Sequence, residues 1–172
     1  MAIEQTLLGL LARQPRHGYE LTKEFMPETT LGDIVHLESG MLYAHLKKLQ
    51  KEGWVTSRLE AQESRPPRRI FSITDAGQSE LQRWLAEPVS KTRDIRLDFL
   101  LKLYTAQEHN PGLAEKLIGD QRAVCERLIE SLREQMDAEE DDFRRLVLEM
   151  RLAQNAALLS WLRRAAGRLI PE

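Results

Sequence analysis

The residues best suited to chemistry lie between Ser39 and Val55, where aromatic and basic side chains share one side of an expected helix. Met41 and three leucines recur there at helical spacing, which predicts a buried stripe formed by Met41, Leu42, Leu46 and Leu49. The side chains of Tyr43, Lys47, Lys48 and Lys51 fall largely off this stripe. Lysines neutralise phosphates, and a tyrosine hydroxyl can bond to a phosphate or a base edge. This face therefore favours contact with nucleic acid, the alternative being a solvated helix face.

The segment after this helix supplies a second basic element. Gly53 ends the helix, and residues 54–60 have the composition of a strand. Pro66 and Pro67 predict a hairpin tip, because proline cannot donate to a strand ladder, and residues 68–73 predict the return strand. Such a tip can enter a narrow minor groove or lie along the phosphate backbone through its arginines, which are Arg65, Arg68 and Arg69. The alternative is a mobile, charged hairpin tip.

The positive charge of the chain is local. The 172 residues carry a net charge of −2, whereas the segment 47–69 holds seven lysines and arginines against three acids. A local basic patch can bind phosphates while acidic surface elsewhere discourages indiscriminate binding.

His17 and Tyr19 open another expected helix, residues 17–26. The free N–H groups at a helix start can hold a phosphate, and either side chain could add a donor. Equally, His17 could cap the helix while Tyr19 packs in the core. We expect His45 to be a packing residue, and we expect no metal site, because four histidines and one cysteine show no ligand spacing.

The remaining pattern predicts the elements that must position these residues. Helices are expected at 3–13, 17–26, 38–52 and 75–86, with a loop at 29–33 and Thr74 as an N-cap. Residues 1–86 thus predict a winged helix-turn-helix domain with a two-stranded wing. After a short linker at 87–90, helices are expected at 95–107, 111–136 and 143–169, with a charged turn at 137–142. Residues 87–172 form the second expected domain.

The two long C-terminal helices predict a homodimer. Each has about 25 residues and spans about 38 Å, too long to bury its apolar stripe against one small domain. The stripe of the last helix is expected to include Leu146, Val147, Met150, Ala153, Ala157 and Leu162. Aromatic and polar residues near the domain junction are candidates for a small-molecule pocket, namely Trp84, Arg96, Phe99, Tyr104, His109, Met150 and Trp161. The alternative for each of them is ordinary core or dimer packing.

Several motifs in the first half of the chain, in order, resemble those of PadR-type transcriptional regulators. They are Leu7–Leu11, His17–Leu21, Gly40–Leu49 with Glu52–Gly53, the basic wing, and Ser72–Gly77. Arg93–Leu100 is a weaker match to the start of the family's longer helical domain. Three positions depart from the family pattern: Ala44 replaces a common proline, Met41 replaces a small or hydroxyl residue, and Phe71 replaces a tyrosine. Met41 puts the operator sequence in question, because it lies near the front of the recognition helix.

The resemblance implies a mainly α protein that regulates transcription by binding double-stranded DNA. We expect a cytoplasmic dimeric repressor whose recognition helices lie about 34 Å apart on a pseudo-palindromic operator. The resemblance also implies release by a small aromatic effector such as a phenolic acid, without a cofactor. The residues expected to contact DNA are His17, Tyr19, Ser39, Gly40, Met41, Tyr43, Ala44, Lys47, Lys48, Lys51, Arg65, Arg68 and Arg69.

Alternative functions are an activator of the same fold and a winged-helix module that binds protein. The basic wing argues against the second, since a protein-binding wing need not be cationic. An enzyme is the weakest alternative, because the sequence has no glycine-rich phosphate loop, nucleophile elbow or His-Glu-x-x-His motif. We expect neither a membrane span nor a signal peptide, and the single cysteine, Cys125, fits a reducing compartment.

Overall fold

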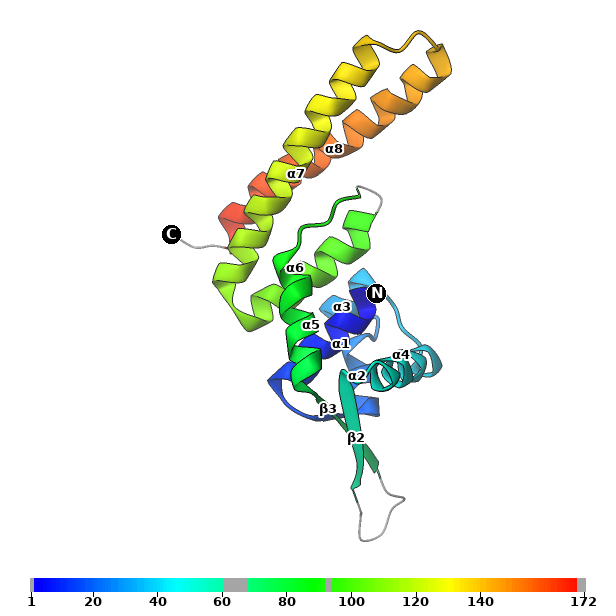
Figure 1. Ribbon diagram of the computed structural model, residues 1–172, viewed down its shortest axis with the longest axis vertical. Helices are drawn as coiled ribbons and strands as arrows, with labels where there is room; N and C mark the ends of the chain where they lie inside the picture. The colour runs from blue at the N-terminus through cyan, green and yellow to red at the C-terminus, as the bar shows by residue number, and fades with distance from the viewer. Residues whose placement is uncertain (1, 61–67, 92–93, 170–172) are drawn as a thin grey trace.

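In the computed structural model, a β-hairpin and a helical hairpin extend from opposite ends of a helical body (Figure 1). The structure describes residues 2–60, 68–91 and 94–169. The hairpin is formed by β2 (Val55–Glu60) and β3 (Arg68–Ile73), and the helical hairpin by α7 (Pro111–Asp137) and α8 (Asp142–Leu169). Among the described residues, no helix has the length and apolarity required to cross a membrane.

The first half of the chain forms the expected winged helix with two additions. Its helices are α1 (Ala2–Arg13), α2 (Gly18–Glu24), α4 (Ser39–Lys51) and α5 (Asp75–Ala86). The expected loop at 29–33 is wrong, since Thr30–Ile34 form the short helix α3, whose first turn is stabilised by the Thr29 hydroxyl accepting from the Gly32 N–H at 3.0 Å. The sheet also has a third strand, β1 (Arg16–His17), in the antiparallel order β1-β3-β2.

The second half is helical, as expected, but it begins differently. Ile95–Phe99 form a π-helical turn that continues into α6 (Leu100–His109) rather than a regular helix from residue 95. Two helix starts match the sequence prediction closely. The Asn110 side chain accepts from the Gly112 N–H at 2.9 Å and starts α7, while the Thr74 hydroxyl accepts from the Gly77 N–H at 3.1 Å and starts α5.

Helix α1 contacts elements of both halves of the chain. It packs on α6, α5, α4 and β3. Its approach to α6 is close, because a Cβ at Gly9 would lie 2.4 Å from the Thr105 Cγ2. His109 Nε2 also lies 3.1 Å from the Gly9 carbonyl oxygen, and Gln5 donates to Glu80 of α5 at 3.0 Å. Any movement of α6 therefore acts directly on α1.

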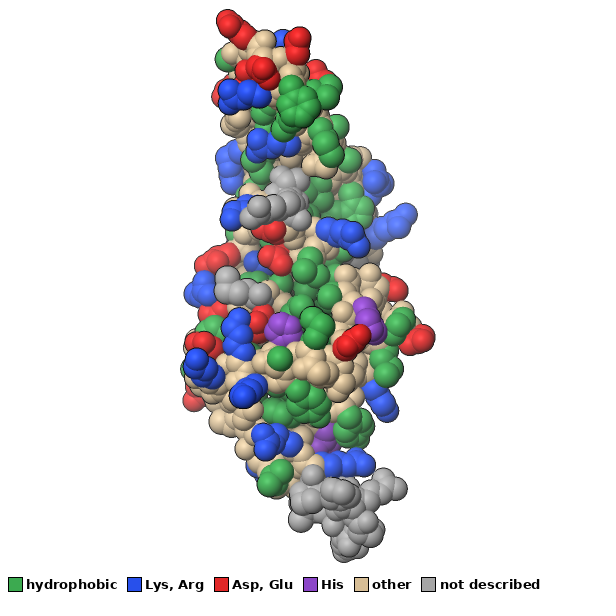
Figure 2. Space-filling model, turned by 90° about the vertical axis from the view of Figure 1, so that its right-hand side faces the viewer, with side chains coloured by type: hydrophobic (Ala, Val, Ile, Leu, Met, Phe, Trp, Pro, Cys, Tyr) green, Lys and Arg blue, Asp and Glu red, His purple; other side chains and the backbone are tan. Residues whose placement is uncertain are grey.

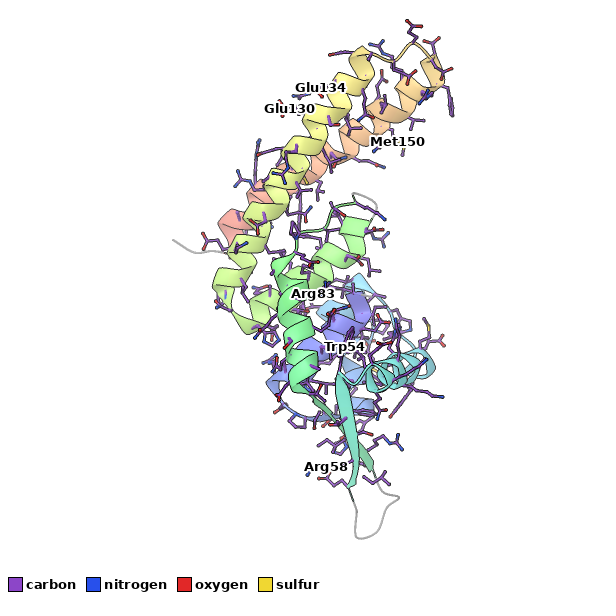
Figure 3. The ribbon with its side chains drawn as sticks, viewed as in Figure 1. Trp54, Arg58, Arg83, Glu130, Glu134 and Met150 are labelled. Atoms are coloured by element: carbon purple, nitrogen blue, oxygen red, sulfur yellow. The ribbon has the colours of Figure 1, made fainter. Side chains whose placement is uncertain are left out.

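Helix α8 has two apolar faces rather than the single stripe expected from the sequence. The face against α7 contains Leu148, Leu159 and Leu162, which are buried. Three large residues of the expected stripe, Leu146, Val147 and Met150, are instead exposed, and so is Phe143 near the start of the helix. Figure 3 shows Met150 pointing away from α7. This outward set, which we call the α8 outer stripe, has the i, i+3, i+4, i+7 spacing of one helix face.

Candidate nucleic-acid interface

Helix α4 turns one apolar face inward and a broad face outward. Leu42, Leu46 and Leu49 are buried beneath it, as the sequence predicts. Met41 was expected among them, and this is wrong, since its side chain is 54% exposed. The helical spacing explains the error, because position 41 lies about 100° from Leu42 and falls on the flank. The outward face is centred on Gly40, Ala44, Lys47 and Lys51, with Ser39 at its start, and all five are exposed.

Tyr43 lies at the edge of this face that borders the sheet. Its side chain is 45% exposed, and its ring makes an edge contact with Phe71 of β3 at 6.4 Å between centroids. Its hydroxyl lies against Gly18 so closely that a Cβ there would be 2.3 Å from the Tyr43 oxygen. Gly18 and Phe71 thus set the direction in which Tyr43 presents its hydroxyl.

A recess of about 390 Å³ lies between α2, α4 and the start of β3. It is lined by His17, Gly18, Tyr19, Tyr43, Arg68 and Arg69, so the structure brings together five residues expected to contact DNA. The guanidinium carbon of Arg68 lies 5.1 Å from the centroid of the Tyr19 ring, and His17 stacks on that ring at 5.8 Å. A recess with two arginines, a histidine and two tyrosine hydroxyls suits a phosphate of a nucleic-acid backbone.

His17 combines a structural role with its place in this recess. Its backbone N–H donates to the Glu20 carboxylate at 2.8 Å at the start of α2, and its Nε2 lies 3.3 Å from Glu60. The expectation that His17 caps α2 is therefore compatible with its position at the interface. Tyr19 is 43% exposed, which excludes the alternative that it belongs to the core.

Lys48 pairs with an acid of the same chain, although its own side chain is 53% exposed. Its Nζ lies 2.8 Å from Oε1 of the buried Glu4 on α1, and His45 Nδ1 lies 3.2 Å from the same oxygen. His45 thus has a polar partner within the fold, in line with the expected packing role. Among the described residues, Lys47 and Lys51 have no acidic side chain within ion-pairing distance. Two of the three expected lysines of α4 therefore carry an uncompensated charge.

Two basic residues that were not expected as contacts also border the interface. Lys23 of α2 places its Nζ 5.5 Å from the Tyr19 ring centroid, and Arg58 of β2 is exposed on the hairpin (Figure 3). The i, i+4 spacing of Tyr19 and Lys23 on one helix could have indicated the first. Arg65 lies outside the described residues. Figure 2 shows lysine and arginine side chains over much of this side of the molecule, including the body near the hairpin, and acidic side chains both on the body and at the tip of the α7–α8 hairpin.

The seven residues expected to form a small-molecule pocket do not come together within one chain. Phe99 and Trp161 pack edge-on in the core at 6.1 Å, and Tyr104 and His109 lie against α1. Arg96 and Met150 are exposed. Trp84 borders a recess of about 290 Å³, where α5 and the following segment meet α6.

This recess contains a buried lysine. Lys102 is 3% exposed, donates to the Glu87 carbonyl, and places its Nζ 5.1 Å from the Trp84 ring centroid. Burial lowers the pKa of Lys102 to about 8, although Glu87 and Asp98 oppose the shift. Sequence reasoning missed this residue, because a lysine within a helix of mixed composition gives no signal of burial. Among the described residues, no group of three metal-ligating side chains comes together.

Comparisons with known proteins connect both halves of the chain to transcriptional regulators. Residues 7–83 match the transcriptional regulator PadR-like family, and residues 95–169 match the family called virulence activator alpha C-term. The negative transcriptional regulator PadR of Bacillus subtilis is 30% identical over 174 residues, covering 93% of each chain. A probable transcriptional regulator of Mycobacterium tuberculosis is 33% identical over 96 residues, which are 56% of this chain and 50% of that protein.

A solved structure with a similar overall fold is that of Bacillus subtilis PadR in complex with operator DNA. It is 25% identical in sequence and covers 99% of this chain and 100% of its own, with a TM-score of 0.50. The relatives are regulators rather than enzymes, in agreement with the sequence prediction.

Proposed function

The chain belongs to the PadR-like family of transcriptional regulators, which bind DNA, and on this basis we propose that it is a homodimeric repressor. The observation that supports DNA binding by this chain is the outward face of α4, with the small residues Gly40 and Ala44 beside Lys47 and Lys51. The small residues let the helix backbone approach base edges in the major groove, while the lysines neutralise the flanking phosphates. In this arrangement the hairpin lies over the adjacent backbone or minor groove.

The recess beside α2 would hold the backbone on the other side of the groove. Arg68, Arg69 and the hydroxyls of Tyr19 and Tyr43 converge there, and each can bond to a phosphate oxygen. These contacts fix the position of α4 on the duplex without reading its sequence. The base readout would fall to Ser39, Gly40, Met41 and Ala44, which lie at the exposed front of the helix.

A gel-shift titration with the promoter fragment beside the protein's own gene tests this assignment. We expect wild-type protein to bind that fragment far more tightly than a scrambled sequence, and Lys47→Ala with Lys51→Ala to weaken binding at least tenfold with unfolding unchanged. Lys116→Ala is the matched control, because Lys116 is exposed on α7 and paired with Asp120. Equal affinity of the double variant and the control for the promoter would contradict the role of α4.

We propose that the α8 outer stripe forms the interface of the homodimer. Its four large apolar residues are 43% to 73% exposed on one helix face, which is unusual for a surface that meets only water. An isologous interface would pair this stripe with the same stripe of a second copy. Met150→Glu should therefore yield monomers in sedimentation experiments, whereas Ser131→Glu, on the exposed side of α7, should leave the dimer intact. A dimeric Met150→Glu protein would argue against this interface.

Repression and release are the finer parts of the proposal. The Bacillus subtilis relative is a negative transcriptional regulator, and this similarity supports repression. The recess beside Trp84 and Lys102 supports a small effector, because an aromatic ring and an ammonium group lie side by side next to the segment that joins the two halves. A ligand there would alter the packing of α6 on α1 and so the relative pose of the two wings.

Titration with 4-hydroxybenzoate, a probe for small aromatic acids, tests the effector proposal. We expect a change in tryptophan fluorescence that Trp84→Ala abolishes, together with weaker binding to the promoter fragment. Trp54→Phe is the control, since Trp54 lies between α4 and β2, away from the recess. A response that persists in Trp84→Ala would place the effector site elsewhere.

A further inference from the structure

A buried carboxylate joins the central helix to the proposed recognition helix. Glu4 of α1 is 5% exposed, and its Oε1 lies 2.8 Å from Lys48 Nζ and 3.2 Å from His45 Nδ1. Lys48 and His45 are three residues apart on α4, so one oxygen holds two positions on adjacent turns of the same helix flank. Such a contact resists both rotation and sliding of α4 against α1.

The charge of this carboxylate is stable at physiological pH. Burial alone would raise the pKa of Glu4, but the hydrogen bond from Lys48 and further hydrogen bonds outweigh it and lower the pKa to about 2. The same contact raises the pKa of Lys48, chiefly through its hydrogen bond to Glu4. Glu4 and Lys48 are therefore a fully charged pair, with the acid beneath the surface and the ammonium group at its edge.

The position of Lys48 on α4 differs from that of its neighbours. Lys47 and Lys51 lie near the centre of the outward face, whereas Lys48 lies on the flank beside Met41. A lysine side chain is long enough to reach a phosphate from this flank. To do so, Lys48 would have to leave Glu4, and the buried carboxylate would then lose one of its charged donors.

We propose that Glu4 is a positioning residue for DNA binding, which fixes α4 in the winged helix and withholds Lys48 from the phosphate backbone. The inference rests on the proposed function of α4 as the recognition helix. It implies that each α4 contributes two phosphate-neutralising lysines rather than three. The third lysine, Lys48, is instead paired with Glu4, which lies 44 residues away in the sequence.

The salt dependence of operator affinity measures this directly. Each phosphate contact adds about −0.9 to the slope of log affinity against log salt, which is about 3.5-fold in affinity between about 50 and 200 mM salt. We expect Lys47→Ala to reduce the slope by about 0.9 per half-site, and Lys48→Ala to leave it unchanged. In a Glu4→Gln background the slope should steepen by about 0.9 per half-site, and Lys48→Ala should then remove that gain.

If Glu4 had only a structural role, Glu4→Gln would change the unfolding midpoint. The effect of Lys48→Ala on the salt slope would then be the same with glutamate or glutamine at position 4. Should Glu4→Gln fail to fold, the comparison of Lys47→Ala with Lys48→Ala in the wild-type background decides alone. Equal losses of slope in these two variants would overturn the inference while leaving the proposed function intact. If wild-type protein bound promoter and scrambled DNA equally, the proposed function itself would fail, and the inference with it.

Discussion

The contact between Gly18 and Tyr43 predicts that Gly18→Ala changes the stability of the protein in opposite directions with and without the Tyr43 side chain. A Cβ added at Gly18 would lie 2.3 Å from the Tyr43 hydroxyl oxygen and 2.6 Å from Cζ, whereas ordinary contacts begin at 3.4 Å. The overlap of about 1.1 Å forces Tyr43 outward, because the tyrosine is half-exposed and can rotate. Its edge contact with Phe71, worth about 1 kcal/mol, is then lost.

Gly18→Ala should therefore lower the free energy of unfolding by about 1 kcal/mol in the wild-type background. In a Tyr43→Ala background the obstacle is gone, and the exchange of glycine for alanine at the start of α2 should stabilise the protein by up to about 0.5 kcal/mol. Urea unfolding followed by circular dichroism, at one fixed protein concentration, measures all four corners of this cycle. Gly119→Ala on α7, where no atom lies within 4 Å, is the control and should be mildly stabilising.

Operator affinity should change together with this contact. We expect Gly18→Ala to weaken binding to the promoter fragment about tenfold, similar to the loss of about one good hydrogen-bonded contact. A destabilisation of equal size in the wild-type and Tyr43→Ala backgrounds would refute the reasoning, because the effect would then not pass through Tyr43.

Three further predictions follow from single contacts. Gly32→Ala should lower the free energy of unfolding by about 3 kcal/mol or more in urea unfolding, because its Cβ would lie 1.8 Å from the Met26 carbonyl oxygen, which is backbone; a mild effect would contradict this. Burial lowers the pKa of Lys102 from 10.5 to about 8, so the free energy of unfolding of the wild type should rise as the pH is raised from about 8 to 10.5. Lys102→Met should abolish this rise and increase Tm at pH 7. An unchanged pH profile in the variant would contradict the prediction. The fold lowers the pKa of Glu4 from 4.5 to about 2, so its contribution to the free energy of unfolding should be lost as the pH falls between these values. Glu4→Gln should show a flatter dependence of stability on pH there. An equally steep dependence in this variant would contradict the pair with Lys48.

Local patterns in the sequence were sufficient to predict most of the fold. Helix α4, the helix starts at Thr74 and Asn110 and the two strands of the hairpin follow from spacing, capping residues and turn residues within a few positions of each other. The PadR-like family was also predicted correctly from such motifs. The short helix α3 was missed, because a five-residue segment shows no apolar periodicity and its cap, Thr29, is also typical of turns.

Features that depend on contacts between distant residues could not be predicted. Nothing near Lys48 in the sequence indicates that Glu4 neutralises it, and nothing near Lys102 indicates that α6 buries it against Trp84. The candidate small-molecule residues failed to converge for the same reason, since composition identifies aromatic residues but not their neighbours. The exposure of Leu146 and Met150 was likewise hidden, because the sequence of α8 does not say which of its two apolar faces meets α7.

The central claim is that two copies of α4 enter successive major grooves of one operator. Hydroxyl-radical footprinting of wild-type protein on the promoter fragment tests it most directly. The account predicts two protected stretches on one side of the duplex, centred about one helical turn apart, and their loss with Lys47→Ala and Lys51→Ala. A single protected stretch, or protection that persists in the double variant, would contradict it.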